Sequence, residues 1–364
     1  MLFRSEKLAP GQNTDTIQLK TNDPNRRSFS IVVSARGAGN NASTSAIAGK
    51  VVDAAINRSR NLLVYATAPP NKLIFFDLGT KKVTNEIALS KAPTCFTFAE
   101  DFSTAAVGHE GMISAVNLTN YTITKTIELS NTVNDVAWAD SSLYCYTEVT
   151  SYSDYIYWVD IATGTLSSTL ARDVDGRTRI KKVPAQPFMI ATRQQSSPTG
   201  FLTFSIADRK LKSYSHMTLS DFWFSENGEY IFALGGNVYR TSTPTGATDT
   251  FNATINAIGK LKDSSGGTQY YPWWADHSSV TKKLFTINYH YSYQYVIHQF
   301  DDNDYVLEKS YPYDKFYQLN PQSVPFEVQA HYVFANREGT ELAVLRKGKA
   351  DDNNVWSMEM LKVK

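Results

Sequence analysis

Cysteine and net charge are both scarce in this chain, and each scarcity excludes a class of protein. Cys95 and Cys145 are the only thiols among 364 residues, which excludes a disulfide framework and a zinc cluster built from thiolates. Both one bridge between them and two buried free thiols are compatible with the pattern. Because 36 Lys and Arg face 35 Asp and Glu, no basic footprint stands out, and we expect no nucleic-acid partner.

Long apolar runs and familiar catalytic motifs are also missing. No segment approaches the ~18 to 20 apolar residues that a membrane-spanning helix needs, and residues 1–6 lack the apolar region of a signal peptide. There is no Gly-x-Ser-x-Gly elbow, Walker loop or His-Glu-x-x-His segment. We therefore expect no membrane span, and the sequence assigns no catalytic residue, metal or cofactor.

Aromatic and β-branched residues, by contrast, are abundant and recur in short runs. Phe, Trp and Tyr make up 13% of the chain, beside many Val, Ile and Thr, which is the composition of half-buried strands. A polar residue at the end of an apolar strand recurs at Asp77, Asn117, Asp160 and Ser205, at steps of 40, 43 and 45 residues. A period in this range is typical of solenoids and propellers.

The repeat predicts an all-β fold, a seven-bladed β-propeller of four-stranded antiparallel blades. The expected blades cover residues 50–89, 94–129, 133–171, 178–215, 219–256, 268–312 and 326–364. The last has only three strand-like runs, and an unpaired edge would leave backbone groups exposed. We expect residues 43–48 to supply its fourth strand, with residues 28–35 as the alternative. Residues 16–20 and 28–33 otherwise form a short hairpin ahead of the propeller.

Two resemblances to known families extend this prediction. The turn Phe-Ser-Glu-Asn-Gly-Glu-Tyr-Ile-Phe at 224–232, with a similar one at 334–345, resembles the blade turn of bacterial YVTN and WD40-like propellers. Residues 1–40 resemble the last hairpin of a BACON-type, immunoglobulin-like module, although a plain hairpin is the alternative. The resemblances imply a hairpin or module remnant at 1–40, a propeller at 41–364, a larger parent protein, and an address in the periplasm or on the cell surface of a bacterium.

One aromatic cluster is the best candidate for a binding site. Tyr270, Trp273, Trp274 and His290 belong to two adjacent aromatic-rich runs, and rings with polar tips suit sugar or peptide ligands. Packing between blades is the simpler explanation of the same residues, because a propeller needs bulky side chains between its sheets.

Three functions fit these observations. The first is a non-catalytic binding scaffold whose partner is a glycan or a protein. The alternative is a propeller-type lactonase or lyase with a metal in the central channel, and a spacer that positions another domain is the third. Fold alone does not decide among them.

Overall fold

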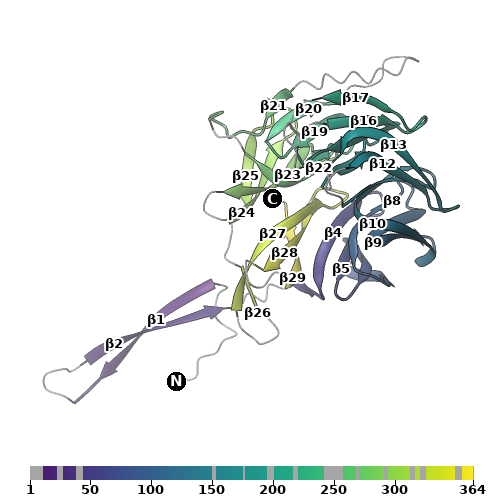
Figure 1. Cartoon of the computed structure of the whole chain (residues 1–364). Coiled ribbons are helices and arrows are strands. Elements are labelled where there is room, and N and C mark those ends of the chain that lie inside the picture. The colour runs from purple at the N-terminus through teal and green to yellow at the C-terminus, as the bar shows by residue number, and fades with distance from the viewer. Residues whose placement is uncertain are drawn as a thin grey trace.

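A computed structural model describes residues 11–22, 28–37, 44–149, 153–174, 177–194, 201–215, 220–241, 257–267, 270–290, 294–311, 316–319, 325–348 and 355–363. Every regular element in these ranges is a β-strand, as the composition predicted (Figure 1). None of the described segments forms a helix long and apolar enough to cross a membrane.

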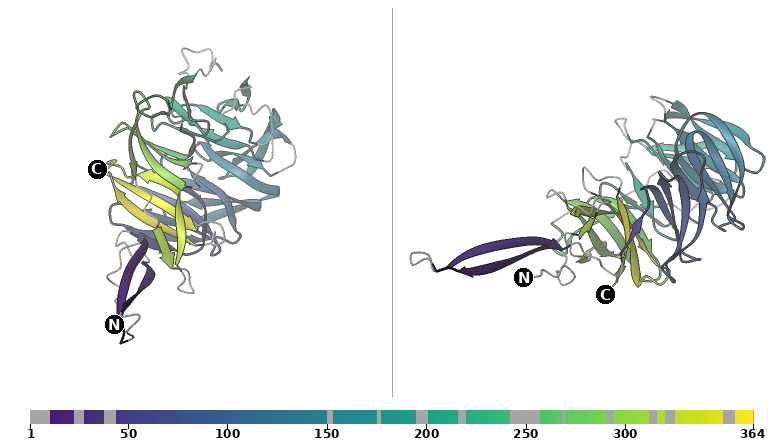
Figure 2. Two further views of the ribbon diagram at one scale, coloured as in Figure 1. Left: turned by 90° about the vertical axis from the view of Figure 1, so that its left-hand side faces the viewer. Right: turned by 90° about the horizontal axis from the view of Figure 1, so that it is seen from below.

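The first two strands form an isolated hairpin. β1 (Gly11–Lys20) pairs antiparallel with β2 (Ser28–Gly37) along ten residue pairs, from Gly11 with Gly37 to Lys20 with Ser28. No other strand joins this sheet among the described residues, and the hairpin projects away from the rest of the protein (Figures 1 and 2). The predicted N-terminal hairpin is therefore confirmed.

The remaining strands form antiparallel sheets arranged around a central cavity, which is the architecture of a β-propeller. The four-stranded sheets, in strand order, are β4 (Lys50–Asn57), β5 (Leu62–Ala68), β6 (Lys72–Asp77) and β7 (Lys82–Ala88); β14 (Arg179–Lys182), β15 (Phe188–Thr192), β16 (Phe201–Ser205) and β17 (Leu211–Ser215); β18 (Phe222–Phe224), β19 (Tyr230–Ala233), β20 (Asn237–Arg240) and β21 (Ala257–Lys260); β22 (Pro272–Ser278), β23 (Lys283–His290), β24 (Gln294–Asp301) and β25 (Leu307–Tyr311).

Two sheets are larger. A five-stranded sheet has the order β26 (Phe316–Leu319), β27 (Pro325–Ala335), β28 (Glu341–Gly348), β29 (Trp356–Lys362) and β3 (Thr44–Ile47). A six-stranded sheet has the order β13 (Thr165–Val174), β12 (Ser153–Asp160), β11 (Leu143–Glu148), β10 (Thr122–Asp140), β9 (Thr104–Asn117) and β8 (Pro93–Phe98).

The expected count of seven blades is not confirmed, because six sheets accompany the hairpin in the described residues. The six-stranded sheet covers two of the predicted repeat units. Its strand β10 is 19 residues long and continues through residues 130–132, where the repeat predicted a break. The first part of β10 pairs with β9 and the second part pairs with β11, so backbone pairing joins the two units.

The first choice for the closing strand is confirmed. β3 pairs antiparallel with β29, from Trp356 with Ile47 to Glu359 with Thr44, so residues near the beginning of the chain complete the sheet that holds its end. The alternative, residues 28–35, lies in the hairpin instead. β3 covers the edge of β29 and itself becomes the outer edge of this sheet.

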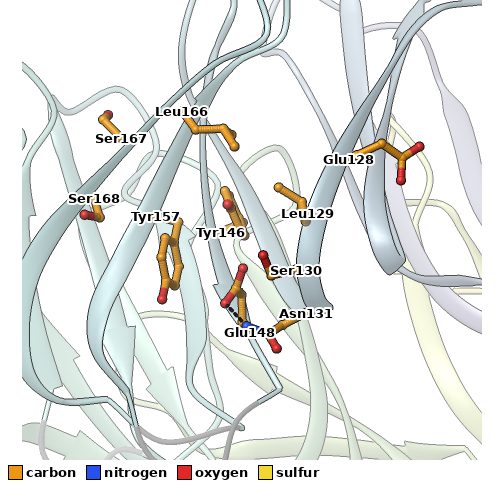
Figure 3. Close-up of a pocket in the computed structure, with 10 residues that line it drawn as sticks. All are labelled: Glu128, Leu129, Ser130, Asn131, Tyr146, Glu148, Tyr157, Leu166, Ser167 and Ser168. Atoms are coloured by element: carbon orange, nitrogen blue, oxygen red, sulfur yellow. Dashed lines mark hydrogen bonds between the residues drawn. The ribbon is translucent and has the colours of Figure 1, made fainter.

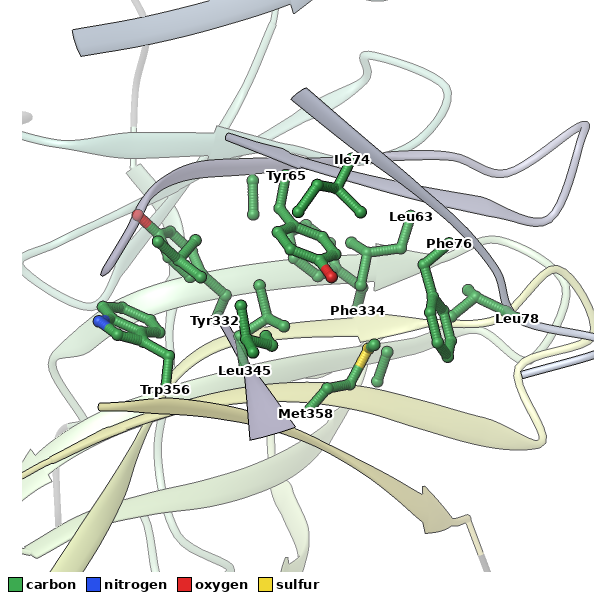
Figure 4. Packing of buried hydrophobic residues seen from close by; sticks show 14 of the residues in the cluster. Leu63, Tyr65, Ile74, Phe76, Leu78, Tyr332, Phe334, Leu345, Trp356 and Met358 are labelled. Atoms are coloured by element: carbon green, nitrogen blue, oxygen red, sulfur yellow. The ribbon is translucent and has the colours of Figure 1, made fainter. Parts of the chain in front are cut away.

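Large side chains between neighbouring sheets hold the ring together. Between the β4–β7 sheet and the five-stranded sheet, Tyr65 and Phe76 pack against Tyr332, Phe334 and other buried residues (Figure 4). Middle strands are covered on both faces, so all but the last residue of β5 are buried. Outer strands such as β7 are mostly exposed, which explains their polar sequence.

Tight turns place two glycines against the neighbouring sheet. Gly228 and Gly339 lie in the two turns that carry the propeller resemblance, and both have positive φ, at 71° and 68°. A Cβ at Gly228 would lie 2.3 Å from the Pro184 carbonyl oxygen. Glycine is required at this position by both the backbone conformation and the close approach.

The two cysteines do not form a bridge. Cys95 and Cys145 are both buried free thiols, so of the two alternatives that the sequence left open, two free thiols is confirmed. Burial raises the pKa of each thiol, which keeps both protonated and inert.

Candidate functional site

The central cavity has a volume of about 580 Å³ and is lined by strands from every sheet of the ring. The lining comes from β4, β8, the second part of β10, β14, β18 with its preceding residue, β22 and β27. It mixes aromatic walls with charged groups of both signs. The charged side chains on these walls are Asp53, Glu100, Asp135, Arg179, Lys181, Lys182, Asp221, Glu226 and Asp276.

Three of the carboxylates tie one inner strand to the next. Each accepts a hydrogen bond from a backbone N–H of an inner strand in the next repeat unit. The bonds run from Phe96 N to Asp53 (3.0 Å), from Ile180 N to Asp135 (2.9 Å), and from Ala335 N to Asp276 (2.8 Å).

Two cations balance the carboxylates on one side of the cavity. The Lys181 ammonium lies 2.9 Å from Asp221 Oδ1 and also donates to the Phe222 carbonyl. The Arg179 guanidinium lies 4.0 Å from Asp135, and its side chain remains 45% exposed. Among the described residues, the Arg179 guanidinium has only this long ion pair, so its donors can face the cavity, whereas backbone N–H groups hold the carboxylates.

Burial separates the protonation behaviour of the carboxylates. It raises the pKa of Asp53 to about 7 and also raises the pKa of Asp135. Burial acts on Asp221 in the same direction, but Lys181 and Arg179 bring the pKa of Asp221 below its usual value. The cavity thus holds carboxyl groups whose pKa burial raises beside one, Asp221, whose pKa two cations lower.

An ion pair joins the β4–β7 sheet to the β22–β25 sheet. Arg58, after β4, lies 2.5 Å from Asp276 on β22, and both side chains are about nine-tenths buried. Burial raises the pKa of Asp276 in spite of this partner. Because Asp276 also binds the Ala335 N–H, one carboxylate connects three sheets.

No metal-binding cluster is formed by the part of the chain that the structure describes. Within those residues, no group of three or more His, Cys, Asp or Glu side chains is placed to hold a metal ion. The acidic residues of the cavity are spread around its circumference and are used by backbone N–H groups instead.

The predicted aromatic residues separate onto different surfaces. Trp274 lines the central cavity, and its indole N–H donates to the Val333 carbonyl at 3.1 Å. Tyr270 packs away from the cavity on β24, with ring centroids 4.9 Å from His298 and 5.3 Å from Phe300.

The other two predicted residues extend this separation. Trp273, next to Trp274 on β22, is 45% exposed and lies 6.2 Å from the His331 ring. His290 ends β23, and its side chain lies outside the described structure. Tyr270, Trp273 and Trp274 therefore do not form a single platform, and ligand binding by these residues stays a prediction.

Sequence reasoning missed the charged residues of the cavity. Asp53, Asp135, Asp221 and Asp276 all lie on or beside inner strands, a recurrence that strand alignment within each repeat could have revealed. Their partners come from the next repeat, as in the 45 residues between Asp135 and Ile180, so local patterns do not indicate them.

Comparisons with known proteins support the fold alone. No family model and no curated protein sequence matches the chain. The β-propeller domain of Cps50 (Swd1) from Myceliophteria thermophila is similar in structure, with a TM-score of 0.65 and 11% identity over 88% of this chain and 98% of that one. Kuenenia stuttgartiensis hydrazine synthase has a TM-score of 0.59 and 13% identity over 86% of this chain and 96% of that one.

These likenesses place the chain among WD40-like β-propellers by fold. They give no support to the bacterial subclass or to the BACON-type module that the sequence resembles. At such low identity, what either protein binds or catalyses does not transfer to this chain.

Proposed function

We propose that this protein is a non-catalytic binding scaffold that holds part of a protein or glycan partner in the mouth of its central cavity. The observation that carries the proposal is the lining of that cavity. Side chains that merely filled the channel would be apolar, whereas this lining contains the partly exposed Arg179, Trp223, Trp274 and several carboxylates. Aromatic walls with a few convergent charges suit a peptide segment or a sugar.

The proposal includes a ring of seven blades. Seven buried clusters each lie between two of the predicted repeat units. One of them joins Cys95 and Ile113 to Tyr144 and Val159, so the two parts of the six-stranded sheet pack face to face as separate blades would. The cavity is lined by inner strands from all seven units. An experimental structure with a different number of radial units would contradict this count.

The cellular address is inferred from the sequence resemblance alone. We place the protein in the periplasm or on the surface of a bacterium, as part of a larger parent protein. Fractionation of the native host with an antibody to the chain would test the address, and recovery in the cytosol would overturn it.

Array screening tests the binding function. The purified chain is screened against glycan and peptide arrays, and hits are measured again with two variants. Thr97 lines the cavity on β8, so Thr97→Arg fills the space and should abolish binding. Thr126 is exposed on β10, so Thr126→Arg adds the same charge outside the cavity and should leave binding intact. A wild-type chain that binds neither class, or a hit that Thr97→Arg leaves unchanged, would refute the proposed site.

A further inference from the structure

A second cavity, distinct from the central one, opens between strands of the six-stranded sheet (Figure 3). It has a volume of about 610 Å³. One wall is formed by residues 128–131 of β10, and the opposite wall is the face formed by β11, β12 and β13. The side chains on this face come from residues that are opposite one another in the sheet, as Tyr146 is to Tyr157 and Tyr157 is to Ser168.

Two tyrosines form the aromatic part of this cavity. The rings of Tyr146 and Tyr157 are stacked, with centroids 5.2 Å apart and planes at 23°. Tyr146 is only 2% exposed, because Tyr157 covers it. The pair therefore offers ring edges, hydroxyl groups and the outer face of Tyr157, rather than a broad flat platform on which a sugar ring could lie.

Glu148 supplies a buried negative charge beside the tyrosines. It lies two residues after Tyr146 on β11, so both side chains point to the same face of the sheet. Glu148 is 7% exposed and accepts a hydrogen bond of 2.8 Å from Asn131 Nδ2. Within the described part of the chain it has no ion-pair partner, and neither Lys nor Arg lines the cavity. A buried carboxylate without a cation is costly, which favours a cationic ligand.

We propose that this cavity binds the side chain of an arginine presented by a protein partner. A guanidinium group is planar and stacks on aromatic faces, and it donates two parallel hydrogen bonds to a carboxylate. Tyr157 offers the face and Glu148 the carboxylate. This site goes beyond the proposed function, because it shares no lining residue with the central cavity.

Titration with a small arginine analogue tests the site directly. The full chain is titrated with Nα-acetyl-L-arginine amide, and binding is followed by saturation-transfer NMR. We expect saturable binding with a Kd of ~1 to 10 mM, the range of a single well-placed contact. The matched control ligand is Nα-acetyl-L-citrulline amide, which has the same shape without the charge and should bind at least ~10-fold more weakly.

Two variants locate the binding, and a third is the control. Glu148→Gln keeps an acceptor for Asn131 but removes the charge, and it should weaken binding at least ~10-fold. Ser168 is exposed opposite Tyr157, so Ser168→Arg places a tethered guanidinium at the site and should block the probe without disturbing the fold. Glu229→Gln makes the same charge change at an exposed turn and should leave the affinity unchanged.

Several results would overturn this inference. They are the absence of saturable binding by the wild-type chain, equal affinity for the citrulline analogue, and an affinity that neither Glu148→Gln nor Ser168→Arg alters. Saturable binding of neutral methyl glycosides with no binding of the arginine analogue would overturn it in favour of a sugar. Thr97→Arg in the central cavity should not change this affinity, so failure of one site is distinguishable from failure of the other.

Discussion

The N-terminal hairpin and the ring of sheets use the same element but differ in what covers their apolar side chains. In the hairpin, Ile17 is opposite Ile31 and Leu19 is opposite Phe29, which places four apolar residues on one face. Leu19, Phe29 and Ile31 are 38%, 47% and 41% exposed. In the ring, Phe75 and Phe285 are completely buried. Backbone pairing alone therefore does not bury side chains; the stacking of one sheet on another does.

This contrast has a consequence for stability. A two-stranded hairpin without a packing partner is at best marginally stable in water. The ring gains its free energy from large side chains between sheets, at about 25 cal/mol for each Å² of apolar surface removed from water. Substitutions should therefore have large effects in the ring and small effects in the hairpin.

The largest effect is expected between the sheets that close the ring. Trp356 on β29 is 1% exposed, and its ring lies 5.2 Å from His331 and 6.2 Å from Tyr332. Trp356→Ala should lower the free energy of unfolding by about 3 to 5 kcal/mol, as expected for a large cavity in a packed core. Urea denaturation measures the change.

The exposed Trp273 provides the matched control for this experiment. Trp273→Ala removes the same side chain from a site where it is 45% exposed, and it should cost less than about 1 kcal/mol. Equal costs for the two variants would contradict the view that packing between sheets dominates the stability of the ring.

A somewhat smaller loss is expected from a buried ion pair between sheets. Arg58→Met leaves the buried carboxylate of Asp276 without its cation, and it should lower the free energy of unfolding by about 3 kcal/mol. Lys72→Met removes the cation of the exposed Lys72–Glu86 pair, whose side chains are 36% and 43% exposed. That change should cost at most about 1 kcal/mol. Urea denaturation of both variants in the same buffer measures the two losses. A loss for Arg58→Met no larger than that for Lys72→Met would refute a stabilising role of the Arg58–Asp276 pair.

Much of the fold could be predicted from the sequence, because strands repeat locally. Alternation and turn residues predicted most of the strands, the hairpin and the closing strand, which the structure confirms. Two strands differ from the prediction, because β21 and β26 lie outside the blade bounds 219–256, 268–312 and 326–364. The number of sheets could not be predicted in the same way. Pairing along β10 continues across a predicted boundary, and backbone hydrogen bonds of this kind leave little trace in side-chain patterns.

Much less of the candidate site could be predicted. An aromatic run indicated Trp274, which does line the central cavity. Adjacent residues on a strand point to opposite faces, however, so Trp273 and Trp274 have different surroundings. The carboxylates escaped notice because Asp53 and Asp135 bind backbone groups of the following repeat. Only the closed ring brings those groups together.

The ring also contains a pH-dependent contribution that the hairpin lacks. Burial raises the pKa of Asp53 from 3.8 to about 7, so its stabilising contribution is complete below pH ~4 and is lost as the pH rises through 7. Between pH ~4 and 7 the free energy of unfolding of the wild-type chain should therefore decrease. Asp53→Asn should make this slope shallower, by at most about 1.4 kcal/mol per pH unit. Denaturation at a series of pH values measures the slope.

An exposed aspartate serves as the control for the pH experiment. Lys212 lowers the pKa of Asp208 to about 2, so this carboxyl group does not titrate between pH ~4 and 7. Asp208→Asn should therefore leave the slope in that window unchanged. A slope that Asp53→Asn does not alter would show that Asp53 has an ordinary pKa.

The smallest effect is expected in the hairpin itself. Ile31 is 41% exposed on the apolar face of β2, so Ile31→Ser should change the free energy of unfolding of the ring by no more than about 0.5 kcal/mol. Ile287 on β23 is fully buried, and Ile287→Ser should cost at least ~3 kcal/mol because it combines a cavity with a buried hydroxyl. The two variants make the same chemical change in the same type of element, so denaturation isolates the contribution of sheet stacking. A large loss for Ile31→Ser would mean that the hairpin and the ring unfold as one unit.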